Sequence, residues 1–295
     1  MNRLHWLDYG VFILYFLIVS GYGYWIYHKK KFKQTDTKDF FLAEGSLTWW
    51  AIGASLIASN ISAEHFIGMA GSGFAIGLAI SSYEWMSSAT LILVAVFFIP
   101  IYLKNKIYTM PQFLSQRYND TVATIMAVFW LLLYVFVNLT SILYLGSLAV
   151  SSISGIPFMY CMIGLALFAI FITLGGMKVI GYTDIVQVVV LVLGGLIVTY
   201  LALDMVSKQF GGNGIFSGLS ILRTQADDHF HMIFSKGHKY YYELPGFAIL
   251  AGGMWINNLN YWGCNQYIVQ RALGADLPTA RSGILFAAFL KLLIP

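Results

Sequence analysis

Long apolar runs separated by short polar segments follow one another along the whole chain. A helix needs about 20 apolar residues to cross the hydrocarbon core of a membrane, because each helical residue rises only about 1.5 Å. Seven windows of this kind are found at residues 7–27, 47–71, 76–103, 122–149, 157–175, 184–206 and 244–268, and an eighth begins near residue 282. The alternating pattern of a membrane β-strand is absent. The pattern therefore predicts an all-α, polytopic membrane protein embedded in a lipid bilayer.

Composition supports the same class of protein. Of the 295 residues, 59% are hydrophobic and only 10% are charged, whereas about a quarter are charged in average globular domains. This excludes a disordered chain, a disulfide-rich secreted module and an ordinary soluble enzyme. The net charge of +4 comes without a basic cluster interleaved with aromatic residues, so nucleic acid is not an expected partner. No nucleophile–base pair or cofactor motif is found, so we expect neither an enzyme nor a bound cofactor.

Loop charges predict an orientation in the membrane. If residues 28–46 lie in the cytoplasm, the loops 104–121, 176–183 and 269–281 lie there too, and these four segments carry eleven Lys and Arg residues. The opposite side carries five, most of them in the long polar loop 207–243. The positive-inside rule then predicts that the amino terminus lies outside the cytoplasm.

Four ionisable residues fall at predicted membrane depth, where each costs roughly 2.5–3.5 kcal/mol on insertion scales. They are Glu64, Glu84, Asp184 and Lys291. Glu64 belongs to a polar run, residues 59–65, that interrupts an otherwise apolar window. A helix broken near the midplane frees backbone carbonyls that can bind Na⁺. The alternative is a continuous helix with a polar stripe facing other protein segments.

Glu84 and Ser87 are three residues apart and therefore share one helix face. A carboxylate in that position can accept hydrogen bonds from the hydroxyl groups of a sugar. It can equally be a structural partner of His65 or Lys291, and the sequence does not decide between these roles.

Amide side chains mark two further windows. Asn138 lies inside the fourth window, where it is either a ligand or a helix–helix contact. Residues 255–266 contain four asparagines and a glutamine together with three aromatic residues. Aromatic faces stack on sugar rings, and carboxamides supply donors and acceptors together. Because a lipid-facing helix would not tolerate this density of amides, the segment is predicted to line a polar cavity.

The spacing of the two polar-rich windows, the second and the seventh, suggests two inverted repeats of five helices. On this interpretation the chain is one transmembrane domain with four parts: a leading helix and basic cytoplasmic loop (1–46), the first repeat (47–206), an extracytoplasmic loop (207–243) and the start of the second repeat (244–295). No internal sequence identity supports the repeat, only the number of windows.

Several long motifs resemble the sodium/solute symporter family, in particular its sodium/glucose and bacterial sodium/galactose cotransporters. They are the stretch from Ala54 to Met69 (ASLIASNISAEHFIGM), SYEWMS at 82–87, FVNLTS at 136–141 and YWG at 261–263. The resemblance implies a LeuT-type fold of ten core helices in two inverted repeats, preceded by an extra helix. It also implies alternating access, in which Na⁺ moving down its gradient drives uptake of a sugar such as galactose or glucose.

The resemblance also implies roles for individual residues. The family's sugar-contacting positions fall on His65, Glu84, Ser87, Asn138, Asn258 and Lys291. The aromatic gate on the cytoplasmic side falls on Tyr261, with Trp262 beside it. Backbone carbonyls of Ala58 and Ile61 match Na⁺ ligands, and Asp184 matches an acidic residue of the ion exit path. Some bacterial members have Gln where His65 stands, which leaves the exact sugar open.

Length is the main departure from the family. Its members carry several more helices than the seven complete ones and the start of an eighth predicted here, so we expect a truncated LeuT-type fold and an incomplete part of a transporter. Alternative interpretations are a symporter of inositol, sialic acid or another polar solute, a symporter-like sensor module, and a non-functional fragment. The sequence does not indicate an oligomeric state.

Overall fold

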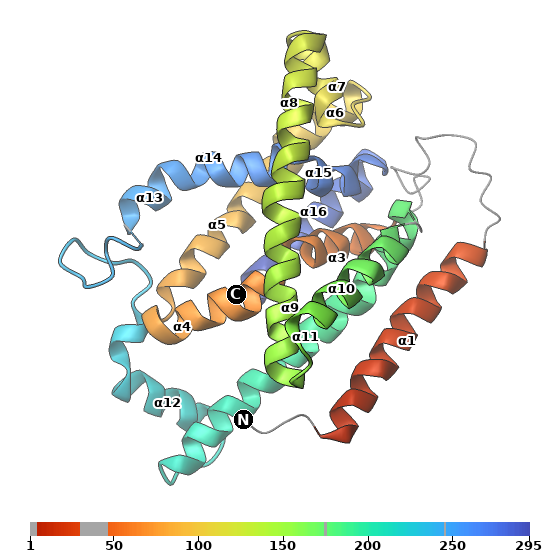
Figure 1. The fold of residues 1–295 in the computed structure, drawn as a ribbon. Coiled ribbons are helices and arrows are strands. Elements are labelled where there is room, and N and C mark those ends of the chain that lie inside the picture. Colours follow the sequence, from red (N-terminus) through yellow and green to blue (C-terminus); the bar gives the residue numbers. More distant parts are fainter. Residues whose placement is uncertain (1–4, 30–46, 174–175, 245) are drawn as a thin grey trace.

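The computed structural model describes residues 5–29, 47–173, 176–244 and 246–295, and within these ranges the chain contains helices and no strand (Figure 1). Four of the described helices are long and apolar enough to cross a membrane, namely Trp6–Ile26, Ala79–Lys104, Asp120–Ser154 and Val179–Gln209. The prediction of an all-α protein with several membrane-length helices is therefore confirmed. Most of the basic segment 28–46 lies outside the described residues.

The α-helices are α1 (Trp6–Lys29), α3 (Trp49–Asn60), α4 (Ala70–Ile76), α5 (Ala79–Leu93), α6 (Ile99–Lys104), α7 (Met110–Arg117), α8 (Asp120–Leu133), α9 (Thr140–Ser154), α10 (Phe158–Thr173), α11 (Gly176–Gln209), α12 (Ile215–Gln225), α13 (Phe247–Ala251), α14 (Gly253–Leu259), α15 (Gln266–Leu273) and α16 (Leu277–Leu293). Short π-helical segments are η2 (His65–Met69), η3 (Val94–Phe98), η4 (Tyr134–Leu139) and η6 (Asn260–Cys264), and η5 (Asp227–Phe230) is a 3₁₀ turn. Through η3 and η4, α5 continues into α6 and α8 into α9.

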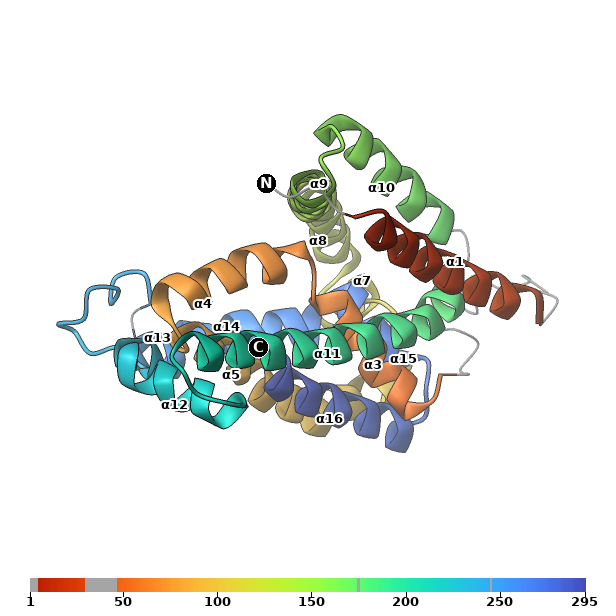
Figure 2. The ribbon, with the colours of Figure 1, turned by 90° about the horizontal axis from the view of Figure 1, so that it is seen from below.

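The core forms where α3, α5, α11 and α16 pack together. Figure 2 shows α9 and α10 on one side of α11 and α16 on the other. The α3–α16 contact is close because glycines face it: a Cβ on Gly53 would lie 2.7 Å from the Gly283 carbonyl oxygen, and one on Gly283 would lie 2.8 Å from the Trp49 carbonyl oxygen. Small residues of this kind allow helix backbones to approach closely in membrane proteins.

Two apolar windows, 47–71 and 244–268, are interrupted rather than continuous. After α3 the chain is extended at Ile61 (φ −83°, ψ 116°), and after η6 it is extended in nearly the same way at Asn265 (φ −83°, ψ 121°). The structure thus has the broken helix, with the break at residues 61–62 inside the polar run 59–65, and not the continuous helix with a polar stripe. Residues 255–266 are likewise broken, one residue before the segment ends.

Three boundaries differ from the sequence prediction. The predicted loop 176–183 is the first part of α11, because the apolar pattern continues through it. The predicted polar loop 207–243 contains α12 and η5. Of the predicted loop 269–281, residues 269–273 belong to α15, an amphipathic helix that is buried from residue 268 to 273 and contacts α3, and residues 277–281 belong to α16.

Candidate solute-binding site

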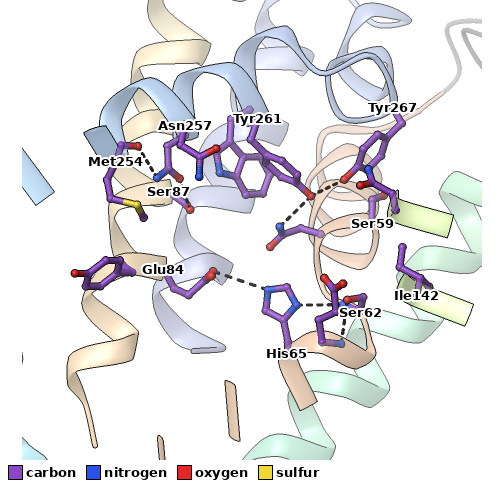
Figure 3. Close-up of a pocket in the computed structure, with 16 residues that line it drawn as sticks. Ser59, Ser62, His65, Glu84, Ser87, Ile142, Met254, Asn257, Tyr261 and Tyr267 are labelled. Atoms are coloured by element: carbon purple, nitrogen blue, oxygen red, sulfur yellow. Dashed lines mark hydrogen bonds and ion pairs between the residues drawn. The ribbon is translucent and has the colours of Figure 1, made fainter. Parts of the chain in front are cut away.

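A cavity of about 280 Å³ lies where the two interrupted helices face α5 and the continuous helical span formed by α8, η4 and α9 (Figure 3). This volume is close to the lower end of the roughly 300–1,000 Å³ typical of small-molecule pockets. Seven of the predicted solute and gate residues line it: His65, Glu84, Ser87, Asn138, Asn258, Tyr261 and Trp262. Segments up to about 200 residues apart in the chain therefore supply one polar cavity, as the Asn-rich pattern predicted.

A charged pair forms one wall of the cavity. Lys291 on α16 contacts the Glu84 carboxylate and donates a hydrogen bond to the Asn60 side-chain oxygen. The Lys291 side chain is only 1% exposed, while that of Glu84 is 26% exposed and lies 4.0 Å from the His65 ring nitrogen. Lys291 itself is not among the lining residues and lies behind Glu84. Glu84 is thus both a structural partner of Lys291 and a carboxylate open to the cavity.

The neighbouring wall is fixed by a hydrogen bond between α5 and α14 and by a second one within α14. The Ser87 hydroxyl donates to the Asn258 side-chain oxygen at 2.8 Å, and the Asn258 amide donates to the Met254 carbonyl oxygen at 3.0 Å. Since its hydrogen is used in this way, the Ser87 oxygen is left as an acceptor. Together with Glu84 one turn earlier, it gives this wall two acceptors for hydroxyl groups.

Aromatic side chains on η6 close the cavity on another side. The Tyr261 and Trp262 rings meet edge to face with centroids 5.1 Å apart, and Trp262 is 2% exposed. The Tyr261 hydroxyl accepts hydrogen bonds from the Asn60 amide at 3.1 Å and from the Tyr267 hydroxyl at 2.8 Å. These contacts hold the Tyr261 ring between the ends of the two interrupted helices.

Four cavity residues lie on π-helical segments: His65 on η2, Asn138 on η4, and Tyr261 and Trp262 on η6. A π-segment adds one residue to a turn, turns side chains away from the regular 3.6-residue repeat and is frequent at functional sites. In this cavity it aims polar side chains inward from helices whose other residues are largely apolar.

The break after α3 removes the usual hydrogen-bond donors of several backbone carbonyls, among them those of Ala58 and Ile61. In a continuous helix the Ser62 N–H would reach the Ala58 carbonyl, and the His65 N–H would reach the Ile61 carbonyl. Here the Ser62 N–H donates to the His65 ring nitrogen at 3.3 Å, and the His65 N–H donates to the Ser62 carbonyl at 3.1 Å. The two carbonyls predicted to bind Na⁺ are therefore among those that lose their helical donors. The Asn60 carbonyl loses its donor as well, because the Glu64 N–H donates to the Ser62 hydroxyl at 3.2 Å.

Asp184 does not line the cavity but belongs to a second buried cluster beside α3. Its carboxylate accepts a hydrogen bond from the Ser55 hydroxyl at 2.5 Å and lies 3.9 Å from the Arg271 guanidinium. The Arg271 Nε donates to the Ser55 oxygen at 2.8 Å. Arg271 was counted above as a cytoplasmic loop charge, and this was wrong, because its side chain is buried on α15.

Asn60, Tyr267 and Arg271 are the residues that sequence reasoning missed. Asn60 lies in the polar run 59–65, so a signal for it existed. Tyr267 follows the Asn-rich segment directly, and nothing in the local pattern distinguishes its hydroxyl. Arg271 lay in a segment interpreted as a loop, and its burial follows only from the packing of α15 against α3.

Comparison with known proteins shows the family of this chain. A profile of the Sodium:solute symporter family matches residues 40–294. The chain is 52% identical to a sodium/glucose cotransporter of Vibrio parahaemolyticus, over all of this chain and 54% of that protein. It is 34% identical to the mouse (Mus musculus) sodium/myo-inositol cotransporter 2, over 97% of this chain and 43% of that protein. The chain thus spans about half the length of these relatives.

A solved structure shares the fold. The substrate-bound, outward-open structure of a Na⁺-coupled sialic acid symporter superposes with a TM-score of 0.83 at 22% sequence identity, covering 99% of this chain and 59% of that one. The predicted LeuT-type transporter fold, of which these 295 residues form a part, is therefore confirmed.

Proposed function

Because the chain belongs to the sodium:solute symporter family, we propose that it forms part of a Na⁺-coupled symporter that takes up a sugar by alternating access. The observation that carries the proposal is the cavity itself. It brings together a partly exposed carboxylate, a hydroxyl and an amide that are fixed by hydrogen bonds, and an aromatic ring. These groups lie where the two interrupted helices face each other, next to backbone carbonyls without helical donors. The proposal assigns binding and release to this site, and no covalent chemistry.

The charges around the cavity favour a neutral polyol over an anionic solute. Glu64 and Glu84 both line it, whereas the ammonium of Lys291 is held by Glu84 and Asn60 behind the wall. A carboxylate on the solute would approach these two acidic side chains, which is unfavourable at low dielectric. Sugar hydroxyls instead donate to Glu84 and Ser87, and the sugar ring stacks on Tyr261. A neutral cyclitol such as inositol fits the same chemistry.

For Na⁺, we propose the backbone carbonyls of Ala58 and Ile61 as ligands. Two carbonyls fall short of the roughly six oxygens that hard cations seek, so further ligands come from outside this pair. Binding of Na⁺ and of sugar at the same broken helix is reciprocal: if Na⁺ raises the affinity for sugar, sugar raises the affinity for Na⁺ by the same factor.

The remaining parts of the proposal concern the membrane. We place the protein in the cell (inner) membrane with its amino terminus outside, which puts the Asp184 cluster toward the cytoplasmic side and makes Tyr261 and Trp262 the inner gate. Asp184 then lies on the path by which Na⁺ leaves.

The test is uptake of radiolabelled sugar by the complete protein that contains these residues, reconstituted in proteoliposomes. We expect accumulation under an inward Na⁺ gradient and none when K⁺ replaces Na⁺. Unlabelled glucose, galactose and myo-inositol should compete, and sialic acid should not. Equal accumulation in K⁺ would refute the coupling ion, and competition by sialic acid alone would refute the neutral polyol.

A further inference from the structure

The Asp184 cluster contains a buried, positively charged side chain, that of Arg271, to which the proposed transport cycle gives no role. The side chains of Asp184 on α11 and Arg271 on α15 are each only 10% exposed, and Ser55 on α3 joins them. Ser55 is one helical turn before Ala58, so the cluster lies about 5 Å along α3 from the first proposed Na⁺ ligand. A carboxylate this near the ion site already faces a positive charge supplied by the chain.

The contact between the two charged groups is loose. The closest guanidinium nitrogen is 3.9 Å from the carboxylate oxygen, whereas a direct charged N–H···O hydrogen bond is about 2.7–2.9 Å and Arg pairs are often bidentate. Arg271 reaches Asp184 mainly through the Ser55 hydroxyl, which accepts from Arg271 and donates to Asp184. The carboxylate therefore keeps capacity for another cation.

One carboxylate cannot pair fully with two cations at once. The cation left without a partner would be a buried, uncompensated charge, which is costly in free energy. We propose that Arg271 is an internal competitor of Na⁺: it holds Asp184 while the path is empty and gives up the carboxylate when Na⁺ arrives. This inference rests on the proposed function and deepens it, because it assigns to Arg271 the positioning role that sets how tightly the path holds the ion.

Arg271 is also connected to the cavity. Its guanidinium donates to the Tyr267 carbonyl oxygen within α15, and the Tyr267 hydroxyl donates to the Tyr261 hydroxyl. Tyr261 in turn accepts from Asn60, which accepts from Lys291. A shift of Arg271 away from Asp184 therefore acts on α15, whose Tyr267 hydroxyl is hydrogen-bonded to Tyr261. In this way the arrival of Na⁺ is coupled to the position of the Tyr261 ring at the gate.

The test measures ²²Na⁺ binding to the purified complete protein without sugar, so that its outcome does not depend on transport. Arg271→Gln removes the competitor and is expected to lower the half-saturating Na⁺ concentration about three- to tenfold, because apparent affinity scales with the fraction of competent protein. Arg271→Lys is the matched control: it keeps a positive charge that competes for Asp184, so the half-saturating Na⁺ concentration should not fall. In the Asp184→Asn background, Arg271→Gln should change nothing.

Unchanged or weaker Na⁺ binding by Arg271→Gln would overturn the inference, and so would an equal shift in the Asp184→Asn background. If Arg271→Gln does not fold, Ser55→Ala takes its place, since it removes only the bridge between the two groups. It should tighten Na⁺ binding if Arg271 competes, and weaken it if Ser55 merely supports the ion site. Wild-type protein that binds Na⁺ without transporting sugar would refute the proposed substrate and leave this inference standing.

Discussion

Two ion pairs of the same composition, a carboxylate with a basic side chain, lie on either side of α3. In the pair Glu84–Lys291, the base is 1% exposed and the carboxylate 26% exposed toward a cavity. In the pair Asp184–Arg271, both side chains are 10% exposed, and neither lines that cavity. The first pair thus exposes its carboxylate to the cavity, whereas the second encloses its charges against the core.

The difference follows from the two basic groups. The compact ammonium of Lys291 satisfies Glu84 and Asn60 together and can be buried completely. The planar guanidinium of Arg271 divides its donors between Ser55 and the Tyr267 carbonyl, and only approaches the carboxylate. A tight ion pair keeps the wall of a cavity fixed. A loose ion pair leaves its carboxylate able to bind a second cation, as a site on an ion path requires.

The largest effect is expected at the pair that faces the cavity. Glu84→Ala removes the proposed acceptor for sugar hydroxyls and leaves Lys291 buried without its charged partner, a loss that typically costs about 3–5 kcal/mol. Sugar uptake should fall to background. Glu84→Gln keeps the size and one acceptor oxygen, and should lose about tenfold or more in sugar affinity while the protein stays folded.

The control for this variant is Asp204→Asn, which breaks the Asp204–Lys208 pair near the end of α11. Lys208 is mostly exposed, and such surface pairs contribute about 0–1 kcal/mol. Uptake should remain within about twofold of the wild type. Normal uptake by Glu84→Ala, with the protein present in the membrane, would contradict the role given to the cavity.

A smaller and more selective effect is expected at the enclosed pair. Asp184→Asn keeps a side-chain oxygen for Ser55 but removes the charge that attracts Na⁺. The half-saturating Na⁺ concentration for uptake should rise about tenfold, equivalent to about 1.4 kcal/mol, while sugar affinity at saturating Na⁺ stays unchanged. Equal losses in both affinities would mean that the two pairs are not functionally distinct.

The sequence predicted the open pair far better than the enclosed one. Glu84, Ser87 and Asn258 were identifiable because polar groups at membrane depth are costly and mark functional positions. The broken helix was identifiable from the polar run 59–65. In the same way, the windows 7–27, 76–103 and 122–149 agree with observed helices because the membrane imposes both their length and their apolar character.

What the sequence could not predict depends on contacts between distant segments. Asn60 is hydrogen-bonded to Lys291, which lies 231 residues away in the sequence, and Ser55 is hydrogen-bonded to Arg271, which lies 216 residues away. The π-segments that carry His65, Asn138 and Tyr261 inward add single residues to helices, and hydrophobic periodicity does not detect such insertions. The amphipathic helix α15 was interpreted partly as a loop because it has only eight residues.

The smallest expected effect tests whether the two pairs communicate. Tyr267→Phe keeps the ring but removes the hydroxyl that donates to Tyr261, while Asn60 continues to hold the Tyr261 oxygen. Loss of one hydrogen bond of about 1 kcal/mol corresponds to a change of about fivefold, and we expect it in the coupling factor, measured as the ratio of sugar affinities with and without Na⁺. Tyr134→Phe is the matched control: it removes a hydroxyl bound to Asn265 in the same aromatic cluster and leaves in place the hydrogen bonds that Asn60 and Tyr267 donate to the Tyr261 hydroxyl. If both variants reduced the coupling factor equally, the cluster would act through general packing, and the hydrogen bonds from Arg271 to Tyr261 would carry no signal between the ion path and the sugar cavity.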